Sequence, residues 1–234
     1  DFYRNLFPTS KHYAELSGRP DTIIASSIHP LTLVAGIKIS KKFGIPCICE
    51  VRDLWPLSLV EMGKIKDNNF ITNILYKMEH YIYKKADSII FTMEGGRNYI
   101  LDKGWNDVDL SKIYHINNGV DLCKFSEKQT TEIFDDIDLN NKHTFKLVYT
   151  GSIRSFNNIE TIVNVARLMN KEKFKDIRFI IYGEGDDRRY LERICNEERL
   201  QNIVFKGRVD KKYIPYILGK SDLNLLIYME YIFC

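Results

Sequence analysis

Three apolar runs of this sequence are followed by turns that combine glycine with polar or charged side chains. GSIR occupies 151–154 after the run FKLVYT, YGEGDD occupies 182–187, and NNGVD occupies 117–121. Glycine lets a ligand approach the backbone closely. The planar guanidinium of Arg154 can donate two parallel hydrogen bonds to phosphate oxygens. Each turn alone is more simply explained as a turn, but their recurrence indicates a site for a phosphate-bearing ligand.

The hydrophobic pattern predicts the elements that must hold these turns. Helices are predicted where apolar residues recur every three to four positions, at 30–43, 70–86, 94–103, 158–169, 187–199 and 211–218. Strands are predicted at 21–26, 45–51, 87–92, 112–117, 145–150, 177–183, 202–207 and 222–228. Several of these strands are apolar without alternation, which is typical of parallel sheets buried on both faces.

A polar stretch from Cys123 to Thr144 interrupts the alternation of strands and helices. We therefore expect an α/β protein with two Rossmann-like parallel-sheet domains, at 1–125 and 145–234, joined by a linker at 126–144 and facing a cleft. Ligands of open parallel sheets bind at the carboxyl ends of the strands. The three glycine turns are therefore predicted to border that cleft.

Composition narrows the class of protein. The chain has 234 residues and a net charge of +3 with acids and bases mixed along its length, which argues against a nucleic-acid-binding protein. No apolar run approaches the roughly 18–20 residues of a membrane span. The five cysteines show no metal-ligand spacing. We expect them to be small buried hydrophobic residues of a protein in a reducing compartment.

Acidic and histidine motifs suggest no metal site. DVD at 107–109 and DID at 136–138 resemble metal-binding DxD motifs, but both are better interpreted as solvated turn acids. His29 and His115 have no partners at metal or triad spacing. His29 nevertheless follows a predicted strand, so we expect it to face the cleft.

The predicted helix ILYKMEHYIYKKA at 74–86 places Lys77, Lys84 and Lys85 on its outer side together with tyrosines. A solvated face with snorkelling side chains explains this arrangement. Contact with the anionic cytoplasmic face of a membrane explains it as well. The sequence leaves both interpretations open.

Several motifs occur here in a specific order, namely EVRDLWP, ADSIIFTMEGG, NNGVD, LVYTGS, RFIIYGEG and NIVFKGRV. From about Asp21 to Tyr228, the chain resembles the family 4 glycosyltransferases of the GT-B fold. The resemblance is strongest to members that build bacterial capsule, O-antigen or exopolysaccharide. It implies a retaining, metal-independent transfer of a sugar from a nucleoside diphosphate sugar to a lipid-linked or saccharide acceptor. No cofactor is expected, and the implied location is cytoplasmic, with a possible peripheral contact to the inner face of the plasma membrane.

The resemblance also implies roles for individual residues. The first domain takes the acceptor, with Arg52 and Asp53 at the catalytic position and Asn118, Gly119 and Asp121 bordering the cleft. The second domain takes the donor, whose diphosphate faces the 151–154 loop, while the YGEG turn and Gly207-Arg208-Val209 line the base and ribose. The implied donor-binding residues are Gly151, Ser152, Arg154, Gly183, Glu184, Gly185, Arg208 and Val209.

The chain departs from the family pattern in several places. Many relatives have histidine where Arg52 stands, and a guanidinium cannot act as a base at neutral pH. Relatives also have arginine and lysine where this loop has Ser152 and Asn157. The E-x7-E pair of relatives and their first glycine-rich strand end are not found, so both ends look cut and both domains incomplete. We expect the chain alone not to transfer sugar. The alternatives are a non-catalytic nucleotide-sugar-binding fragment or subunit, or a nucleotide-sugar epimerase of the same fold.

Overall fold

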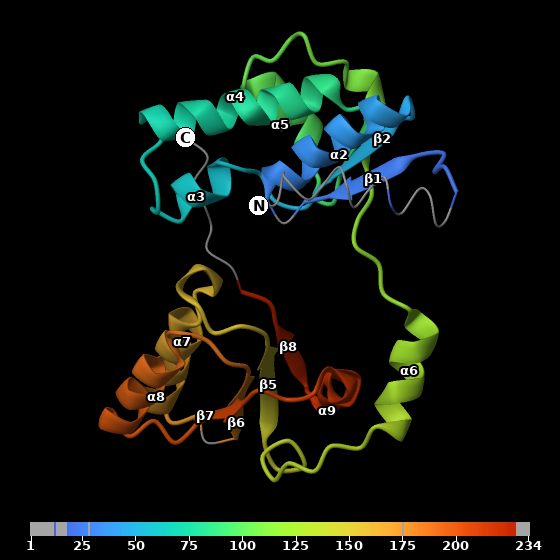
Figure 1. The fold of residues 1–234 in the computed structure, drawn as a ribbon. Helices are drawn as coiled ribbons and strands as arrows, with labels where there is room; N and C mark the ends of the chain where they lie inside the picture. The colour runs from blue at the N-terminus through green and yellow to red at the C-terminus, as the bar shows by residue number, and fades with distance from the viewer. Residues whose placement is uncertain (1–11, 13–17, 28, 175, 228–234) are drawn as a thin grey trace. The chain divides into compact units, whose positions relative to one another are not determined.

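The computed structural model describes residues 12, 18–27, 29–174 and 176–227, which form two compact units, Asp1–Gly119 and Val120–Cys234. Each unit contains one sheet covered by helices (Figure 1). Among the helices of the described ranges, none combines the length and the apolar character that crossing a bilayer requires.

The first unit is built on a four-stranded parallel sheet in the order β1-β2-β3-β4. Its strands are β1 (Ile23–Ser26), β2 (Cys47–Val51), β3 (Ser88–Phe91) and β4 (Ile113–His115). Its helices are α2 (Pro30–Phe43), α3 (Leu57–Glu61), α4 (Phe70–Lys85) and α5 (Gly96–Asp102), and a 3₁₀ turn, η1, spans Leu110–Lys112. Every neighbouring pair of strands is parallel, as the apolar strand pattern predicted.

Local signals set the helix ends of the first unit. α2 has Pro30 in its first turn and ends at Gly44, whose φ of 64° lies in the left-handed region that glycine tolerates. α4 begins at Asn69, whose side chain accepts the backbone N–H of Thr72 at 2.8 Å. The N-terminal half of α4 nevertheless leaves Ile71 exposed, although the helical spacing predicted a continuous buried stripe.

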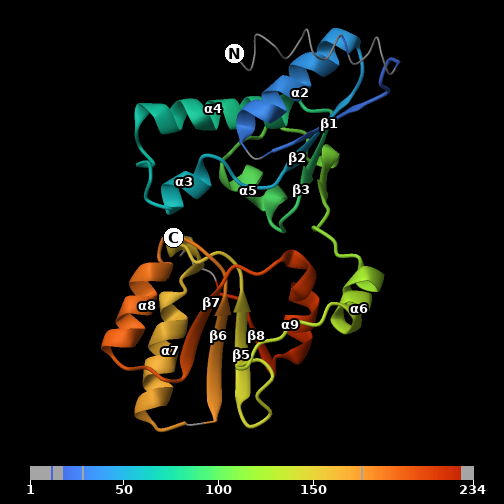
Figure 2. The same ribbon diagram turned by 60° about the horizontal axis from the view of Figure 1, so that its bottom comes forward.

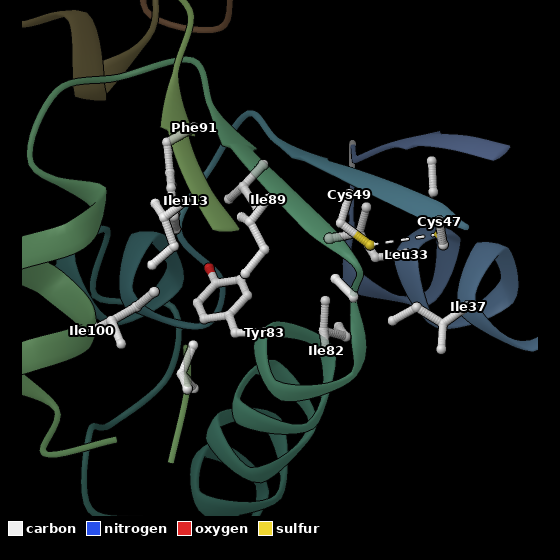
Figure 3. Close-up of a cluster of buried hydrophobic side chains, with 14 of the residues drawn as sticks. Leu33, Ile37, Cys47, Cys49, Ile82, Tyr83, Ile89, Phe91, Ile100 and Ile113 are labelled. Atoms are coloured by element: carbon white, nitrogen blue, oxygen red, sulfur yellow. Dashed lines mark hydrogen bonds between the residues drawn. The ribbon is translucent and has the colours of Figure 1, made fainter. Parts of the chain in front are cut away.

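The core of the first unit lies between its sheet and helices α2, α4 and α5 (Figure 3). Cys47 and Cys49 are fully buried on one face of β2, and their sulfur atoms lie 3.9 Å apart. Together with the burial of Cys195, this confirms the predicted hydrophobic role for these three cysteines. The prediction was wrong for Cys123, which is exposed on a surface helix. Cys234 lies outside the described residues.

The second unit also has a four-stranded parallel sheet, in the order β7-β6-β5-β8 (Figure 2). Its strands are β5 (Phe145–Thr150), β6 (Ile177–Tyr182), β7 (Ile203–Gly207) and β8 (Leu223–Leu225). Its helices are α6 (Leu122–Thr131), α7 (Glu160–Lys171), α8 (Arg188–Glu197) and α9 (Ile214–Lys220), with 3₁₀ turns η2 (Ser155–Asn157) and η3 (Lys211–Tyr213). The prediction of two parallel-sheet α/β units is thus confirmed.

Both faces of the second sheet are buried. Phe179 and Ile181 of β6 pack under α7 and α8, whereas Ile180 packs with Leu139 and Ile217 on the opposite face. Helix α9 lies on that opposite face (Figure 2). Burial on both faces explains why β5 and β6 are apolar without alternation.

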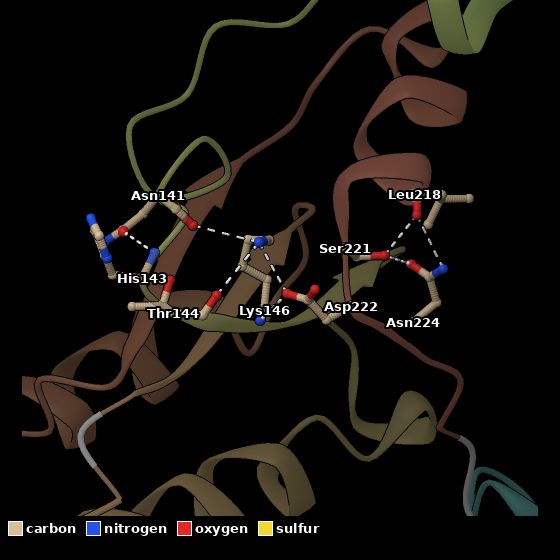
Figure 4. Close-up of polar contacts among 8 residues, drawn as sticks. All are labelled: Asn141, His143, Thr144, Lys146, Leu218, Ser221, Asp222 and Asn224. Carbon is tan, nitrogen blue, oxygen red and sulfur yellow. Dashed lines mark hydrogen bonds and ion pairs between the residues drawn. The ribbon is translucent and has the colours of Figure 1, made fainter.

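Strand β8 is docked on β5 by an ion pair. The Lys146 ammonium lies 3.0 Å from the Asp222 carboxylate, which also accepts the backbone N–H of Lys146 at 2.8 Å (Figure 4). Ser221, just before this strand, donates its hydroxyl to the carbonyl oxygen of Leu218 at 2.7 Å. These contacts join the end of α9 to the sheet edge. The strand predicted at 222–228 is shorter than expected, because β8 ends at Leu225 and neither Leu226 nor Ile227 is in a strand. Tyr228 lies outside the described residues.

The stretch predicted as a linker at 126–144 differs from that expectation, because it folds as part of the second unit. Part of it belongs to α6, which begins where Asp121 accepts the backbone N–H of Lys124 at 3.0 Å and which packs against α9. Leu139 is only 1% exposed. A polar segment of low periodicity can still be ordered when its few apolar side chains reach a distant core, and local pattern does not reveal this.

The DID motif has a structural role that also differs from the predicted solvated turn. Lys206 of β7 lies 3.0 Å from the Asp136 carboxylate and 2.6 Å from that of Asp138. Arg178 of β6 lies 2.7 Å from Asp138. The carboxylate of Asp136 additionally accepts the backbone N–H groups of Asp138 and Leu139. These contacts tie the segment before β5 to the sheet.

Candidate functional site

Backbone hydrogen bonds connect the loops that follow β5, β6 and β7. The N–H of Gly151 donates to the carbonyl of Tyr182 at 3.0 Å, and the N–H of Gly183 donates to the carbonyl of Gly207 at 2.8 Å. The ladder of the parallel sheet thus continues past the strand ends. The three loops therefore form one rigid edge rather than three independent turns.

Close packing of these loops explains two of the glycines. A Cβ on Gly183 would lie 1.8 Å from the carbonyl oxygen of Gly151, and a Cβ on Gly185 would lie 1.9 Å from that of Ile153. No side chain fits at such distances from backbone atoms. The glycines that the sequence suggested for ligand approach are thus required by the packing of one loop on another.

A cavity of about 920 Å³ opens at the carboxyl ends of β5, β6 and β7 within the second unit. This is the edge at which open parallel sheets bind their ligands. Its lining comes from the three connected loops and from η3 and α9, and consists of Thr150, Gly151, Ser152, Tyr182, Gly183, Glu184, Arg208, Val209, Asp210, Lys211 and Ile214.

Most of the predicted donor-binding residues line this cavity, namely Gly151, Ser152, Gly183, Glu184, Arg208 and Val209. Gly185 and Arg154 do not. Arg154 is exposed, and its side chain makes no hydrogen bond or ion pair within the described residues. Helix α7 begins at Glu160, after the η2 turn, and contributes no residue to the lining. The N-terminus of α7 therefore does not line the cavity.

The glycine loop after β5 is held by neutral hydrogen bonds. The Tyr149 hydroxyl donates to the carbonyl oxygen of Ser152 at 2.9 Å, and the Asn157 side-chain amide donates to the same oxygen at 2.5 Å. Asn157 also lies 3.3 Å from the Ser152 hydroxyl. Burial raises the pKa of Tyr149, so its hydroxyl remains a donor at neutral pH. Ser152 and Asn157, where the resemblance implied cations, therefore bond to each other here.

The acidic side chains that line the cavity form ion pairs or hydrogen bonds with the protein, whereas the basic side chains that line it form no ion pair with a described residue. Glu184 forms an ion pair with Arg188 of α8, and the Asp210 carboxylate accepts a backbone N–H at the start of η3. Arg208 and Lys211 are exposed, and neither forms an ion pair with any residue that the structure describes. The cavity thus has two cations available for a ligand, whereas its two acids are already engaged.

The predicted catalytic residues of the first unit lie at the carboxyl end of β2. Arg52 and Asp53 are both exposed, and the backbone N–H of Arg52 donates to the Ser27 hydroxyl at 3.1 Å. His29 is exposed and immediately precedes α2. These side chains share one end of the first sheet, and their participation in a common site with the second unit stays a prediction.

The predicted cleft residues after β4 are exposed. Asn118 and Gly119 lie in the irregular segment that ends the first unit. Asp121 belongs to the second unit, where it accepts the backbone N–H of Lys124 and pairs with its ammonium at 3.1 Å. Asp121 therefore caps the start of α6, and this role accounts for the acid without any contact to a ligand.

Sequence reasoning missed two groups of chemical interest. Lys211 lines the cavity, and its position four residues after the end of β7 was the signal that could have found it. Glu79 of α4 is 3% exposed and accepts the hydroxyls of Tyr83 and Tyr99, each at 2.7 Å. Burial raises the pKa of Glu79 to about 8. Its place between the buried positions of α4 would have predicted its burial.

The described residues contain no group of three or more His, Cys, Asp or Glu side chains that could hold a metal ion. In the DVD motif, Asp107 is exposed and bonded to Lys84 at 2.7 Å and His80 at 2.5 Å. Asp109 accepts the backbone N–H of Ser111 at 2.9 Å. Both acids of this motif therefore occupy an exposed turn, as predicted.

The segment around the cavity matches the model of a known protein family. Residues 130–229 match the family model described as "Glycosyl transferases group 1". This range contains every residue that lines the cavity. The cavity therefore lies within the segment that matches this family model.

Individual proteins are also similar to this chain. Over 148 residues, the chain is 27% identical to an uncharacterized glycosyltransferase of Methanocaldococcus jannaschii, MJ1069, an alignment that covers 62% of this chain and 35% of that protein. HepE of Anabaena, solved in complex with UDP, matches with a TM-score of 0.67 at 13% identity over 94% of this chain and 55% of HepE. Sucrose-phosphate synthase of Thermosynechococcus elongatus matches with a TM-score of 0.69 at 16% identity, over 96% and 54% of the two chains.

The structural matches show the fold, which is the GT-B fold that the sequence predicted. The chain spans about a third of the length of the M. jannaschii protein and just over half of the two solved structures.

Proposed function

We propose that this chain is part of a glycosyltransferase and that the cavity of its second unit binds the nucleoside diphosphate of a sugar donor. The observation that carries the proposal is the position of the cavity. It lies at the carboxyl ends of three parallel strands, inside the segment that matches the group 1 glycosyltransferases. The complex of HepE with UDP supports a nucleoside diphosphate as the ligand class.

In this proposal, the walls of the cavity have separate tasks. The rigid edge formed by Gly151 and Gly183 supplies backbone groups in a fixed geometry, which avoids the entropy cost of ordering a loop on binding. Cations in the cavity stabilise the negative charge that develops on the diphosphate as it leaves the sugar. The nucleoside diphosphate sugar is a substrate, and the reaction is proposed to proceed without a metal and with retention of configuration.

The first unit is proposed to face the acceptor. Arg52 and Asp53 are the candidates for contact with the reacting sugar, and His29 and Asn118 for the border of the acceptor site. The acceptor is proposed to be a lipid-linked or growing saccharide of a cell-surface polysaccharide. The lysines of α4 fit a peripheral contact with an anionic membrane that carries such a lipid.

Isothermal titration calorimetry tests the ligand class directly. The 234-residue chain is titrated with UDP, GDP and ADP, each with and without EDTA. We expect one of the three to bind and its affinity to be unchanged by EDTA. Binding that disappears on chelation would overturn the metal-free proposal. Absence of binding for all three would overturn the proposed function.

A second candidate is a nucleotide-sugar-binding protein that does not transfer the sugar. Arg52 favours it, because a guanidinium stays protonated and cannot act as a base where relatives have histidine. A radiolabelled-donor assay over a panel of nucleotide sugars, with membrane extract as the source of acceptor, separates the two candidates. Transfer of label to the acceptor supports the enzyme, whereas donor binding without transfer supports the binding protein.

A further inference from the structure

We propose that Arg208 and Lys211, on the wall that follows β7, supply the positive charge that binds the diphosphate, in place of the glycine loop that follows β5. This inference rests on the proposed function, because it assigns the contacts of the same ligand in the same cavity. It also changes the role of Arg208, which the sequence pattern assigned to the base and ribose.

The first argument comes from the glycine loop, which lacks a cation directed at the cavity. Ser152 lines the cavity but carries no charge, and its carbonyl oxygen is occupied by the Tyr149 hydroxyl and the Asn157 amide. Arg154 is not part of the lining. The loop can therefore offer hydroxyl and backbone contacts, but no charge-assisted hydrogen bond from a lining side chain.

The second argument comes from the opposite wall. Arg208 and Lys211 both line the cavity, and both are exposed without an ion-pair partner among the residues described. An arginine usually pairs with an available carboxylate, yet Glu184 is paired with Arg188 and Asp210 accepts the backbone N–H of Lys212 at 2.9 Å. The arrangement leaves the two cations free for an anionic ligand.

The chemistry of the two side chains suits a diphosphate. A guanidinium donates two parallel hydrogen bonds to phosphate oxygens, and an ammonium acts as a compact point charge. The carboxylates of Glu184 and Asp210 line the same cavity, and Arg188 already pairs with Glu184. The charges of Arg208 and Lys211 offset the remaining negative charge of Asp210 toward an anionic ligand.

The test measures the affinity of the 234-residue chain for UDP, GDP and ADP by calorimetry at about 0.01 M and about 1 M salt, where the screening lengths are about 30 Å and 3 Å. The variant is the double substitution Arg208→Met with Lys211→Met. Its matched control is Arg193→Met with Lys171→Met, which removes the same two charges from exposed positions of α8 and α7 outside the cavity. Lys211→Arg serves as a charge-retaining variant.

For the double variant, we expect affinity at low salt to fall by at least about tenfold, because each charge-assisted hydrogen bond contributes about that much or more. The difference from the wild type should shrink at high salt. The control pair should bind within about threefold of the wild type. Lys211→Arg should bind more tightly than the double variant, because it keeps both positive charges. All variants should unfold at the wild-type temperature because the substituted side chains are exposed.

Two results would overturn the inference while leaving the proposed function intact. Wild-type affinity in the double variant would show that neither cation touches the ligand. An equal loss at both salt concentrations would show that they contact the base or ribose instead of the diphosphate. A wild-type chain that binds no nucleoside diphosphate would instead overturn the proposed function and this inference with it.

Discussion

The carbonyl oxygen of Gly151 lies so close to Gly183 that a Cβ on Gly183 would be 1.8 Å from it. The clash would be with backbone, which cannot rotate away as a flexible side chain does. Because both residues line the cavity, the same contact that packs two loops together also shapes the site. Stability and ligand binding therefore depend on one glycine.

We expect Gly183→Ala to lower the free energy of unfolding of the second unit by about 1–3 kcal/mol, the usual range for overpacking a tight site. Urea denaturation followed by circular dichroism measures this change. Gly119→Ala is the matched control, because nothing lies within 4 Å of a Cβ at that position. Equal stability of the two variants would show that the loops separate without cost.

Arg154→Ala tests whether the glycine loop or the wall that follows β7 supplies the positive charge that binds the diphosphate. The residue pattern alone predicts a loss of about 1–3 kcal/mol in nucleoside diphosphate binding. Since Arg154 does not line the cavity, we expect a loss of less than about 1 kcal/mol, measured by the same calorimetry as for Arg208. A loss of affinity as large as that of Arg208→Met would show that Arg154 of the glycine loop contacts the diphosphate.

Lys206→Met should destabilise the second unit by about 3 kcal/mol, because it removes the ammonium that pairs with both Asp136 and Asp138. Asp136 is 9% exposed and would keep only backbone donors. Thermal unfolding measures the effect, with the exposed Lys171→Met as control. An unchanged unfolding temperature would mean that the segment before β5 contributes nothing to the stability of the unit.

Glu79 should make the first unit less stable as the pH rises. Its pKa is raised by burial to about 8 in the folded state, so the folded chain holds a proton there that the unfolded chain releases at lower pH. The stability that this proton provides is complete below the unfolded pKa and is lost as the pH rises through about 8. The slope is at most about 1.4 kcal/mol per pH unit.

Glu79→Gln removes this titration and keeps an oxygen that can accept the Tyr83 hydroxyl. We expect the stability of the variant between pH 5 and 8 to vary less than that of the wild type, as measured by urea unfolding at intervals of pH. A wild-type pH dependence in the variant would show that another group is responsible.

The sequence by itself determined the architecture and the edge at which the site lies. Apolar strands without alternation, separated by amphipathic helices, require parallel sheets covered on both faces, and the carboxyl ends of parallel strands meet at one edge. For that reason the sequence alone places Gly151, Gly183 and Arg208 at one edge of the sheet. These features depend on near neighbours in the chain and on the period of each element.

Only the tertiary structure decided which side chains face the cavity and what the polar segment 126–144 does. Arg154 lies outside the cavity and Lys211 inside it because loop direction is set by partners far away in sequence, such as the carbonyl of Glu184, which accepts the N–H of Ile153. Asp136 is buried because Lys206 reaches it from another strand. No periodicity encodes such contacts, since each depends on where two distant segments meet after folding.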